Sequence, residues 1–269
     1  MRRAKIIGFI SIKGGVGKTT TVANLGYILA RDFNKKILVV DGNFSGPNLS
    51  MHFGFTRPKY TLHDVFSGEV ELQKAIFEHS PGLHILPTSI FGKKVDVSKF
   101  HQYMASLRGR YDLILIDSSP SLNQEMMSTI MASDELFVIT TPDYVTLAST
   151  LHAIKVAKQK RTYLSGIIIN KARGKTFELS LDDIQEATKT PVVSVLFDNE
   201  EVLRALADGK PVSMFRKDND VSTEYKKLAA ALIGERYVDK RFKSRITGLF
   251  NKKLSQDEIN RAIVMVSHY

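Results

Sequence analysis

One segment of the chain, residues 13–20, combines glycines, lysines and hydroxyls in an order suited to binding phosphate. Glycines let consecutive backbone N–H groups turn toward phosphate oxygens, and a following helix adds the positive end of its dipole. Lys18 can neutralise the outer phosphates, and the Thr19 hydroxyl can ligate Mg²⁺. The segment follows an apolar run at residues 6–12 and precedes a helical pattern, which is the setting that a phosphate-binding loop requires. The sequence therefore predicts a site for ATP and Mg²⁺ formed by Lys13, Gly14, Gly15, Val16, Gly17, Lys18, Thr19 and Thr20.

Two further apolar runs lead into an aspartate. Asp41 directly follows residues 36–40, and Asp117 closes residues 111–117. A carboxylate at the end of a buried strand can hold Mg²⁺ or the waters around it, and for Asp117 this is the Walker B arrangement. The predicted metal-binding residues are therefore Thr19, Asp41 and Asp117. The alternative for Asp117 is a helix N-cap.

The elements that must position these residues alternate between two patterns. Apolar runs typical of strands buried on both faces span residues 5–12, 36–40, 83–87, 111–117, 136–140, 165–170 and 192–197. Helical patterns span residues 18–31, 97–107, 122–132, 145–160, 179–187, 200–207 and 221–233. This alternation predicts an α/β fold with a doubly wound, mostly parallel sheet and helices on both faces. In such a sheet, ligands bind outside the carboxyl ends of the strands.

The phosphate-binding segment has an unusual form. Where the general pattern has its first glycine, this chain has Ile12, and Lys13 adds a second lysine at the start of the loop. This form resembles the deviant P-loop of the MinD/ParA family of ATPases, and the resemblance extends over residues 5–233. In that family the first lysine reaches across a dimer interface to the phosphates of the partner's nucleotide. The resemblance therefore implies an ATP-dependent homodimer in which Lys13 couples ATP binding to dimerisation.

Other positions take their expected roles from this resemblance. The family usually carries Asp-x-Asp after its second strand, and the second aspartate positions the attacking water; here that position is Asn43. Because some switch GTPases orient water with a neutral amide, Asn43 implies either slow turnover or a switch held mostly in the ATP state. Its alternative is a residue that favours a turn. Asn170 is expected to recognise adenine, with Phe197 and Asp198 in the neighbouring loop, although Asp198 could be an ordinary loop residue. The predicted catalytic residues are Lys13, Lys18, Asp41 and Asn43.

Composition sets broader limits. The chain has 269 residues, 43% of them hydrophobic, and no cysteine, which excludes disulfides, thiolate zinc sites and cysteine-ligated iron–sulfur clusters. The formal net charge of +10 favours anionic partners. No signal-peptide core follows the basic N-terminus, so we expect a cytoplasmic protein. We expect a P-loop ATPase domain at residues 1–234 and a basic helical extension at residues 235–269.

The extension concentrates positive charge. Residues 239–253 hold six basic residues and one acidic residue, and apolar residues recur among them at helical spacing. This pattern is typical of an interfacial helix that binds anionic lipid, and residues 240–253 resemble the membrane-targeting tail of MinD. One alternative is that residues 240–269 form ordinary helices packed on the domain. Another is that the same charges bind nucleic acid.

The leading functional hypothesis is an ATPase of the MinD type. ATP would drive a dimer that positions or recruits partners at a membrane, and hydrolysis to ADP and phosphate would reset it. An activating or cargo protein is then an expected partner, with the ATPase in the cytoplasm or on the membrane periphery. One alternative is a ParA-like ATPase that binds nonspecific DNA during chromosome or plasmid segregation. The other is a nucleotide-dependent scaffold with very slow turnover.

Overall fold

The computed structural model describes residues 3–92, 95–216 and 219–239, and these form an α/β fold around one sheet. Within the described residues the sheet has eight strands in the order β3-β4-β2-β5-β1-β6-β7-β8. All neighbouring pairs are parallel except β3 and β4. The strands are β1 (Lys5–Ile10), β2 (Ile37–Gly42), β3 (Phe77–Ser80), β4 (Leu83–Leu86), β5 (Leu113–Ser118), β6 (Glu135–Thr140), β7 (Tyr163–Ala172) and β8 (Val192–Phe197).

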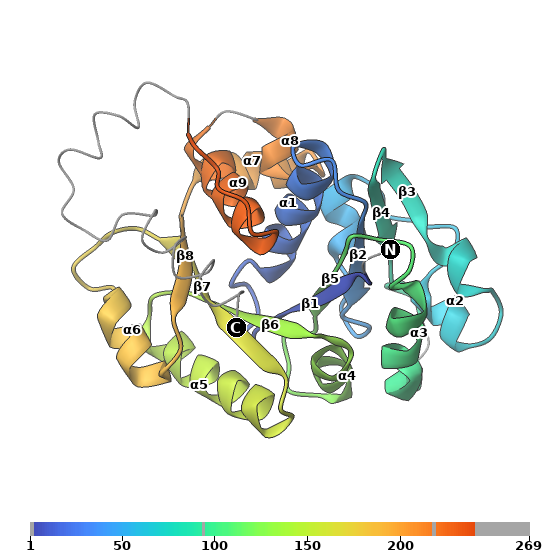
Figure 1. The fold of residues 1–269 in the computed structure, drawn as a ribbon, viewed down its shortest axis with the longest axis horizontal. Helices are drawn as coiled ribbons and strands as arrows, with labels where there is room; N and C mark the ends of the chain where they lie inside the picture. Colours follow the sequence, from blue (N-terminus) through green and yellow to red (C-terminus); the bar gives the residue numbers. More distant parts are fainter. Residues whose placement is uncertain (1–2, 93–94, 217–218, 240–269) are drawn as a thin grey trace.

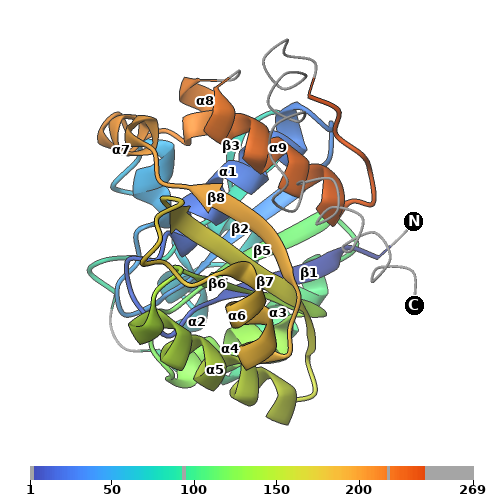
Figure 2. The ribbon, with the colours of Figure 1, turned by 90° about the vertical axis from the view of Figure 1, so that its left-hand side faces the viewer.

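Helices cover both faces of this sheet (Figure 1, and turned by 90° in Figure 2). One face carries α1 (Lys18–Arg31), α7 (Glu200–Ala207), α8 (Val212–Phe215) and α9 (Asp220–Leu232). The other carries α2 (Leu62–Phe66), α3 (Phe100–Leu107), α4 (Gln124–Ala132), α5 (Tyr144–Gln159) and α6 (Leu181–Thr188). Three short 3₁₀ helices in the described residues complete the set: η1 (Leu49–Phe53), η2 (Leu72–Ala75) and η3 (Val97–Lys99). The doubly wound fold with helices on both faces is confirmed.

Strand β1 shows why the chain folds into these layers. Its successive side chains point to opposite faces of the sheet, so Ile7 and Phe9 pack beneath α1 and α9, while Ile6 and Ile10 pack on the other side. Phe9 stacks on Phe137 of β6 with ring centroids 5.8 Å apart. Burying each such large apolar side chain contributes roughly 1.5–3 kcal/mol, so a strand with apolar side chains on both faces is stabilised in the middle of the sheet.

Several element boundaries differ from the sequence predictions. Strand β1 ends at Ile10, since the chain turns into the phosphate-binding loop before residue 12. The helix predicted from residue 97 begins as η3, in which Ser98 N–H donates to the Asp96 side chain, and continues as α3 from Phe100. Strand β3 was not predicted, because its residues are at the sheet edge and none of them is buried.

Parallel pairing brings the carboxyl ends of the central strands to one edge of the sheet. Strand β1 leads there into the loop before α1, and the β2–β5 register places Asp41 opposite Asp117. Of the extension predicted at residues 235–269, only residues 235–239 are described, and they are neither helix nor strand; the 240–253 segment lies outside the described residues. No helix in the described ranges is long and apolar enough to cross a membrane.

Candidate nucleotide-binding site

The loop between β1 and α1 presents the start of α1 to a pocket. Gly15 and Gly17 have φ values of 79° and 91°, which favour glycine, and Gly17 is the N-cap of α1. As a glycine, Gly17 offers no side chain that could cap this helix, and the first turn of α1 carries no acidic residue. A Cβ atom on Gly17 would come 2.0 Å from Nδ2 of Asn170. The first-turn N–H groups and the dipole of α1 are therefore available to an anion.

Three polar side chains meet at the start of α1. Lys18 is 7% exposed, and its Nζ lies 3.3 Å from Oδ1 of Asp117. The Thr19 hydroxyl donates to Oδ2 of Asp117 at 2.5 Å. A buried ammonium group beside uncapped helix N–H groups suits a polyphosphate, and a hydroxyl beside a carboxylate supplies the hard oxygen ligands that Mg²⁺ prefers. These residues therefore fit ATP and Mg²⁺.

Asp41 organises the segment that follows β2. Its Oδ1 accepts the Asn43 N–H at 3.1 Å, and its Oδ2 accepts the Leu49 N–H at 3.2 Å. Burial, reinforced by the negative charge of Asp117, raises the pKa of Asp41 to about 7. A Mg²⁺ ion near this pair of carboxylates would favour their ionised forms. The structure places Asp41 close to the predicted metal site, and its role toward the metal stays a prediction.

Asn43 is 7% exposed, and both the nitrogen and the oxygen of its side-chain amide form hydrogen bonds. Its Nδ2 donates to the Gly46 carbonyl oxygen at 2.5 Å, and the Gly46 N–H donates to its Oδ1 at 3.3 Å. Ser45, between them in the chain, donates from its N–H and its hydroxyl to the Glu125 carboxylate in the first turn of α4. Asn43 thus closes the loop after β2, as the turn alternative expects, and this loop is tied to α4.

Lys13 has surroundings quite different from those of Lys18. Its side chain is 41% exposed, and its Nζ donates to the Thr146 hydroxyl at 2.8 Å and lies 3.7 Å from Oδ1 of Asp143. Asp143 caps α5 by accepting the Thr146 N–H. Burial alone would raise the pKa of Asp143, but hydrogen bonds from Thr141 and Thr146 and the charge of Lys13 lower it below the ordinary value. Lys13 therefore lies at the rim of the loop, against α5.

The residues expected near the adenine come from β7 and β8. Asn170 donates from Nδ2 to the Val16 carbonyl at 2.7 Å, so its amide supports the phosphate-binding loop as well as facing the pocket. Lys171, which the sequence prediction did not include, donates to the Gly15 carbonyl at 2.8 Å. Phe197 is 55% exposed at the pocket wall. Asp198 also lines the pocket, and its Oδ2 pairs with Arg173 at 3.0 Å.

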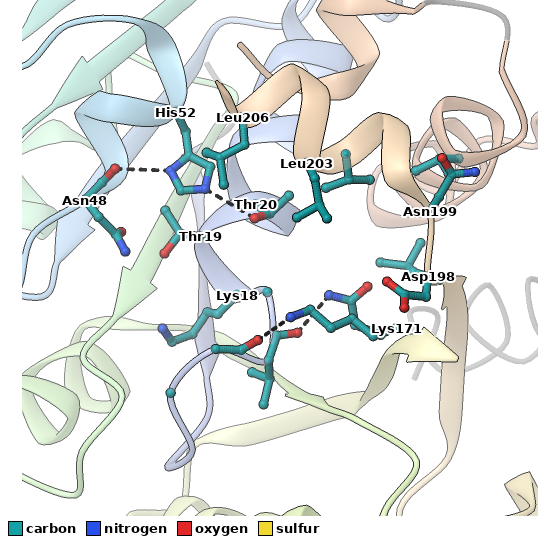
Figure 3. A pocket seen from close by; sticks show the side chains of 18 of the residues that line it. Lys18, Thr19, Thr20, Asn48, His52, Lys171, Asp198, Asn199, Leu203 and Leu206 are labelled. Carbon is teal, nitrogen blue, oxygen red and sulfur yellow. Dashed lines mark hydrogen bonds between the residues drawn. The ribbon is translucent and has the colours of Figure 1, made fainter. Parts of the chain in front are cut away.

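Every site residue predicted from the sequence, except Asp41 and Asp117, lines one open pocket of about 290 Å³ (Figure 3). Lys18 and Thr19 lie on one side of it, and the close-up shows Leu203 and Leu206 of α7 above the loop. Their exposed fractions are 66% and 39%, large for leucines on a helix that packs on the core. The pocket therefore has a charged, hydroxyl-rich end at α1 and an apolar wall at α7. This division suits a nucleotide, whose phosphates are charged and whose base is flat and largely apolar.

Known proteins are similar to this chain over most of its length. The family described as "AAA domain" matches residues 4–165. An uncharacterized ATP-binding protein of Methanocaldococcus jannaschii is 32% identical over 232 residues, which are 85% of this chain and 88% of that protein. The chain belongs to the MinD/ParA family of P-loop ATPases.

Solved structures of MinD share the fold of this family member. MinD of Pyrococcus horikoshii, complexed with Mg-ADP, is similar with a TM-score of 0.81 and 28% identity, over 93% of this chain and 99% of that one. MinD in the MinC–MinD complex of Aquifex aeolicus is similar with a TM-score of 0.78 and 27% identity, over 88% and 99% of the two chains. ATP and Mg²⁺ are accordingly the cofactors of this family member.

Sequence reasoning missed several residues that line the nucleotide pocket. His52 belongs to η1 and Asn48 is its N-cap, and this short helix has no strong signal in the sequence. Leu203 and Leu206 belong to α7. In the sequence, their role in the pocket is indicated only by two leucines on a helix rich in charged residues. Lys171 directly follows Asn170, so its position could have suggested a role in the loop.

Proposed function

We propose that this chain is an ATP-dependent dimerisation switch, in which two copies meet across their nucleotide pockets and separate after ATP hydrolysis. The observation that carries the proposal is the contrast between the two lysines of the loop. Lys18 is buried within its own pocket, whereas Lys13 lies at the rim with 41% of its side chain exposed. A cation at the rim can reach a phosphate presented by another copy, while a buried one cannot.

The surroundings of Lys13 support the proposal further. Its ammonium group is held by Thr146 and Asp143 of the α5 region, outside its own phosphate cradle. Tyr144 and Val145, next to these contacts, are 75% and 71% exposed. Exposed apolar and aromatic side chains bordered by polar and charged residues are typical of protein interfaces. A second copy would cover them while Lys13 exchanges its carboxylate partner for a phosphate.

We further propose that ATP hydrolysis is slow. The Asn43 side-chain amide is hydrogen-bonded to the Gly46 backbone, and this position lacks the carboxylate that could orient the attacking water. Slow turnover would leave the ATP dimer assembled for long periods. An activating partner would then accelerate hydrolysis by rearranging the loop after β2. The Aquifex MinD structure is a complex with MinC, which supports the expectation of a protein partner.

Dimerisation can be tested by measuring molar mass with light scattering in Mg-ATP, a non-hydrolysable Mg-ATP analogue and Mg-ADP. We expect dimers with the analogue and monomers with ADP. Lys13→Gln, which keeps a donor toward Thr146 but no charge, should bind nucleotide and stay monomeric. Lys99→Gln, at an exposed lysine of η3, is the matched control and should behave like the parent. A parent protein that is monomeric with the analogue would overturn the proposal.

The surface that the dimer binds is a separate part of the proposal. The charge pattern of residues 240–253 supports an anionic membrane, and a chain lacking residues 240–269 tests it. The full-length protein should sediment with anionic vesicles in the presence of the ATP analogue. The full-length protein with ADP, and the shortened chain with either nucleotide, should stay in the supernatant. Vesicle binding that survives the deletion would contradict the membrane role. Binding to duplex DNA that falls steeply with salt would favour the ParA-like alternative instead.

A further inference from the structure

His52 joins two parts of the nucleotide site that are far apart in the sequence. It belongs to η1, is 8% exposed, and lines the pocket beside the first turn of α1. Its Nδ1 lies 3.1 Å from the Asn48 carbonyl oxygen, and its Nε2 lies 3.2 Å from the Thr20 hydroxyl. Figure 3 shows these two contacts as a continuous chain across the upper part of the pocket. The imidazole therefore links η1 to the phosphate-binding loop.

The direction of each hydrogen bond follows from the chemistry of the partners. A carbonyl oxygen only accepts, so Nδ1 carries the ring hydrogen and donates it to Asn48. Burial lowers the pKa of His52, against the opposing effects of the Asn48 carbonyl and the charge of Asp117, and so favours the neutral ring. In the neutral ring Nε2 is then an acceptor, and Thr20 donates its hydroxyl hydrogen to it.

This assignment creates a competition for one hydrogen atom. Thr20 is the third residue of α1 after the Gly17 N-cap, and it lines the same pocket as Lys18 and Thr19. A hydroxyl has a single hydrogen to donate. If a phosphate oxygen accepts that hydrogen, the hydrogen bond from Thr20 to His52 is lost.

We propose that His52 is a positioning residue of the nucleotide site, which competes with a nucleotide phosphate for the Thr20 hydroxyl and so links phosphate binding to the position of η1. Phosphate binding breaks the His52–Thr20 bond and loosens η1 from α1. The proposal rests on the ATP site but not on dimerisation, so it can fail or hold independently of the proposed switch.

The contacts of η1 define where such loosening would be felt. Leu49 at its start donates its N–H to Asp41, and the glycine that ends it, Gly54, packs against Gly209 in the turn after α7. A Cβ atom on Gly209 would come 2.9 Å from the Cα of Gly54, so these two turns are in close backbone contact. A shift of η1 would therefore reach both the loop after β2 and the apolar wall of the pocket at α7.

Two substitutions of His52 separate its two hydrogen bonds. His52→Asn keeps a short amide donor for the Asn48 carbonyl but has nothing that reaches Thr20. His52→Gln carries an amide oxygen that can extend to the position of Nε2 and accept from Thr20. The probe is Mg-ADP, titrated by calorimetry against the full-length protein. We expect His52→Asn to bind Mg-ADP about three- to tenfold more tightly than the parent, since one competing hydrogen bond is removed. His52→Gln should stay within about twofold of the parent.

Thr20 provides the coupled half of the test. Thr20→Val removes the hydroxyl, so adding His52→Asn to this variant should leave its Mg-ADP affinity unchanged, whereas Thr20→Ser should retain the effect of His52→Asn. Equal effects of His52→Asn with and without the hydroxyl would show that the two residues act independently and would overturn the proposal. The proposal would also be overturned if His52→Asn bound Mg-ADP no more tightly than His52→Gln.

Amide hydrogen exchange gives a readout that does not depend on affinity. In the parent, saturating Mg-ADP should speed exchange in residues 49–54 while it slows exchange in residues 14–20. In Thr20→Val, exchange in residues 49–54 should be indifferent to Mg-ADP, and this comparison remains available if His52→Asn fails to fold. Equal protection of residues 49–54 by Mg-ADP in the parent and in Thr20→Val would overturn the proposal.

Discussion

Asn43 and Gly46 are joined by two hydrogen bonds that run in opposite directions. The Asn43 amide nitrogen donates to the Gly46 carbonyl, and the Gly46 N–H donates to the Asn43 carbonyl oxygen, at 2.5 Å and 3.3 Å. An aspartate at this position could accept the N–H but could not donate to the carbonyl. The amide therefore explains why this loop closes on itself. A carboxylate at this position would lose the hydrogen bond to the Gly46 carbonyl.

Asn43→Asp should lower the stability of the protein and raise its rate of ATP hydrolysis. Loss of the donated bond leaves a carboxylate facing a carbonyl oxygen, which should cost about 1 kcal/mol of the free energy of unfolding. The released carboxylate can orient the attacking water, so steady-state phosphate release at saturating Mg-ATP should rise about tenfold or more. Asn43→Ala breaks the same bonds without supplying a carboxylate and should not gain activity. Turnover in Asn43→Asp no faster than in the parent would contradict a limiting role for Asn43.

The parts of the site that the sequence predicts are those formed by local patterns. The phosphate-binding loop, the strand before it and the helix after it are contiguous, so their residue types reveal them without knowledge of the fold. Asp117 is predictable for the same reason, because it closes a buried strand and parallel strands share one carboxyl edge.

The parts that the sequence does not predict depend on packing between distant segments. His52 meets Thr20 only because η1 packs on α1, and this contact spans 32 residues that carry no periodic signal. Leu203 is exposed on α7, so neither burial nor periodicity distinguishes it from an ordinary surface leucine. Strand β3 is short and lacks buried residues, and its pairing with β4 depends on a neighbour rather than on its own composition.

Gly17→Ala should weaken nucleotide binding severely. Gly17 has a φ of 91°, where a side chain is strained by roughly 1–2 kcal/mol, and the new methyl group would collide with Nδ2 of Asn170. Because that nitrogen also holds the Val16 carbonyl, the collision displaces the loop itself. We expect a loss of at least about tenfold in Mg-ADP affinity, since every 1.4 kcal/mol is a factor of ten.

Gly109→Ala is the control for this substitution. A Cβ atom there would meet no atom of the described residues within 4 Å, and Gly109 is not among the glycines with positive φ. Its Mg-ADP affinity should equal that of the parent. An affinity of Gly17→Ala within twofold of the parent would show that the loop tolerates a side chain and would contradict the geometry described for Gly17 and Asn170.

The pair Arg108–Asp134 predicts a pH dependence of stability away from the nucleotide site. The Arg108 guanidinium donates to both oxygens of Asp134 at 2.5 Å and 2.8 Å, and the Ile6 N–H donates to Oδ2 at 2.8 Å. Burial alone would raise the pKa of Asp134, but these hydrogen bonds and the charges of Arg108 and Lys5 outweigh it and lower the pKa below its ordinary value. The ionised carboxylate is therefore favoured in the folded protein.

A lowered carboxyl pKa fixes the sign of the effect. Its contribution to stability is present above the unfolded pKa of about 3.9 and is lost as the pH falls through the lower folded pKa. Urea unfolding between pH 7 and pH 3.5 should therefore show the parent more stable than Asp134→Asn at neutral pH, with the difference shrinking below about pH 4. Glu186→Gln, at an exposed position of α6, should show little difference from the parent at any pH. A parent–Asp134→Asn difference that stays constant down to pH 3.5, or grows there, would contradict the role of this ion pair. The stabilisation from a carboxylate with a lowered folded pKa must begin to fall once the pH drops below its unfolded pKa of about 3.9.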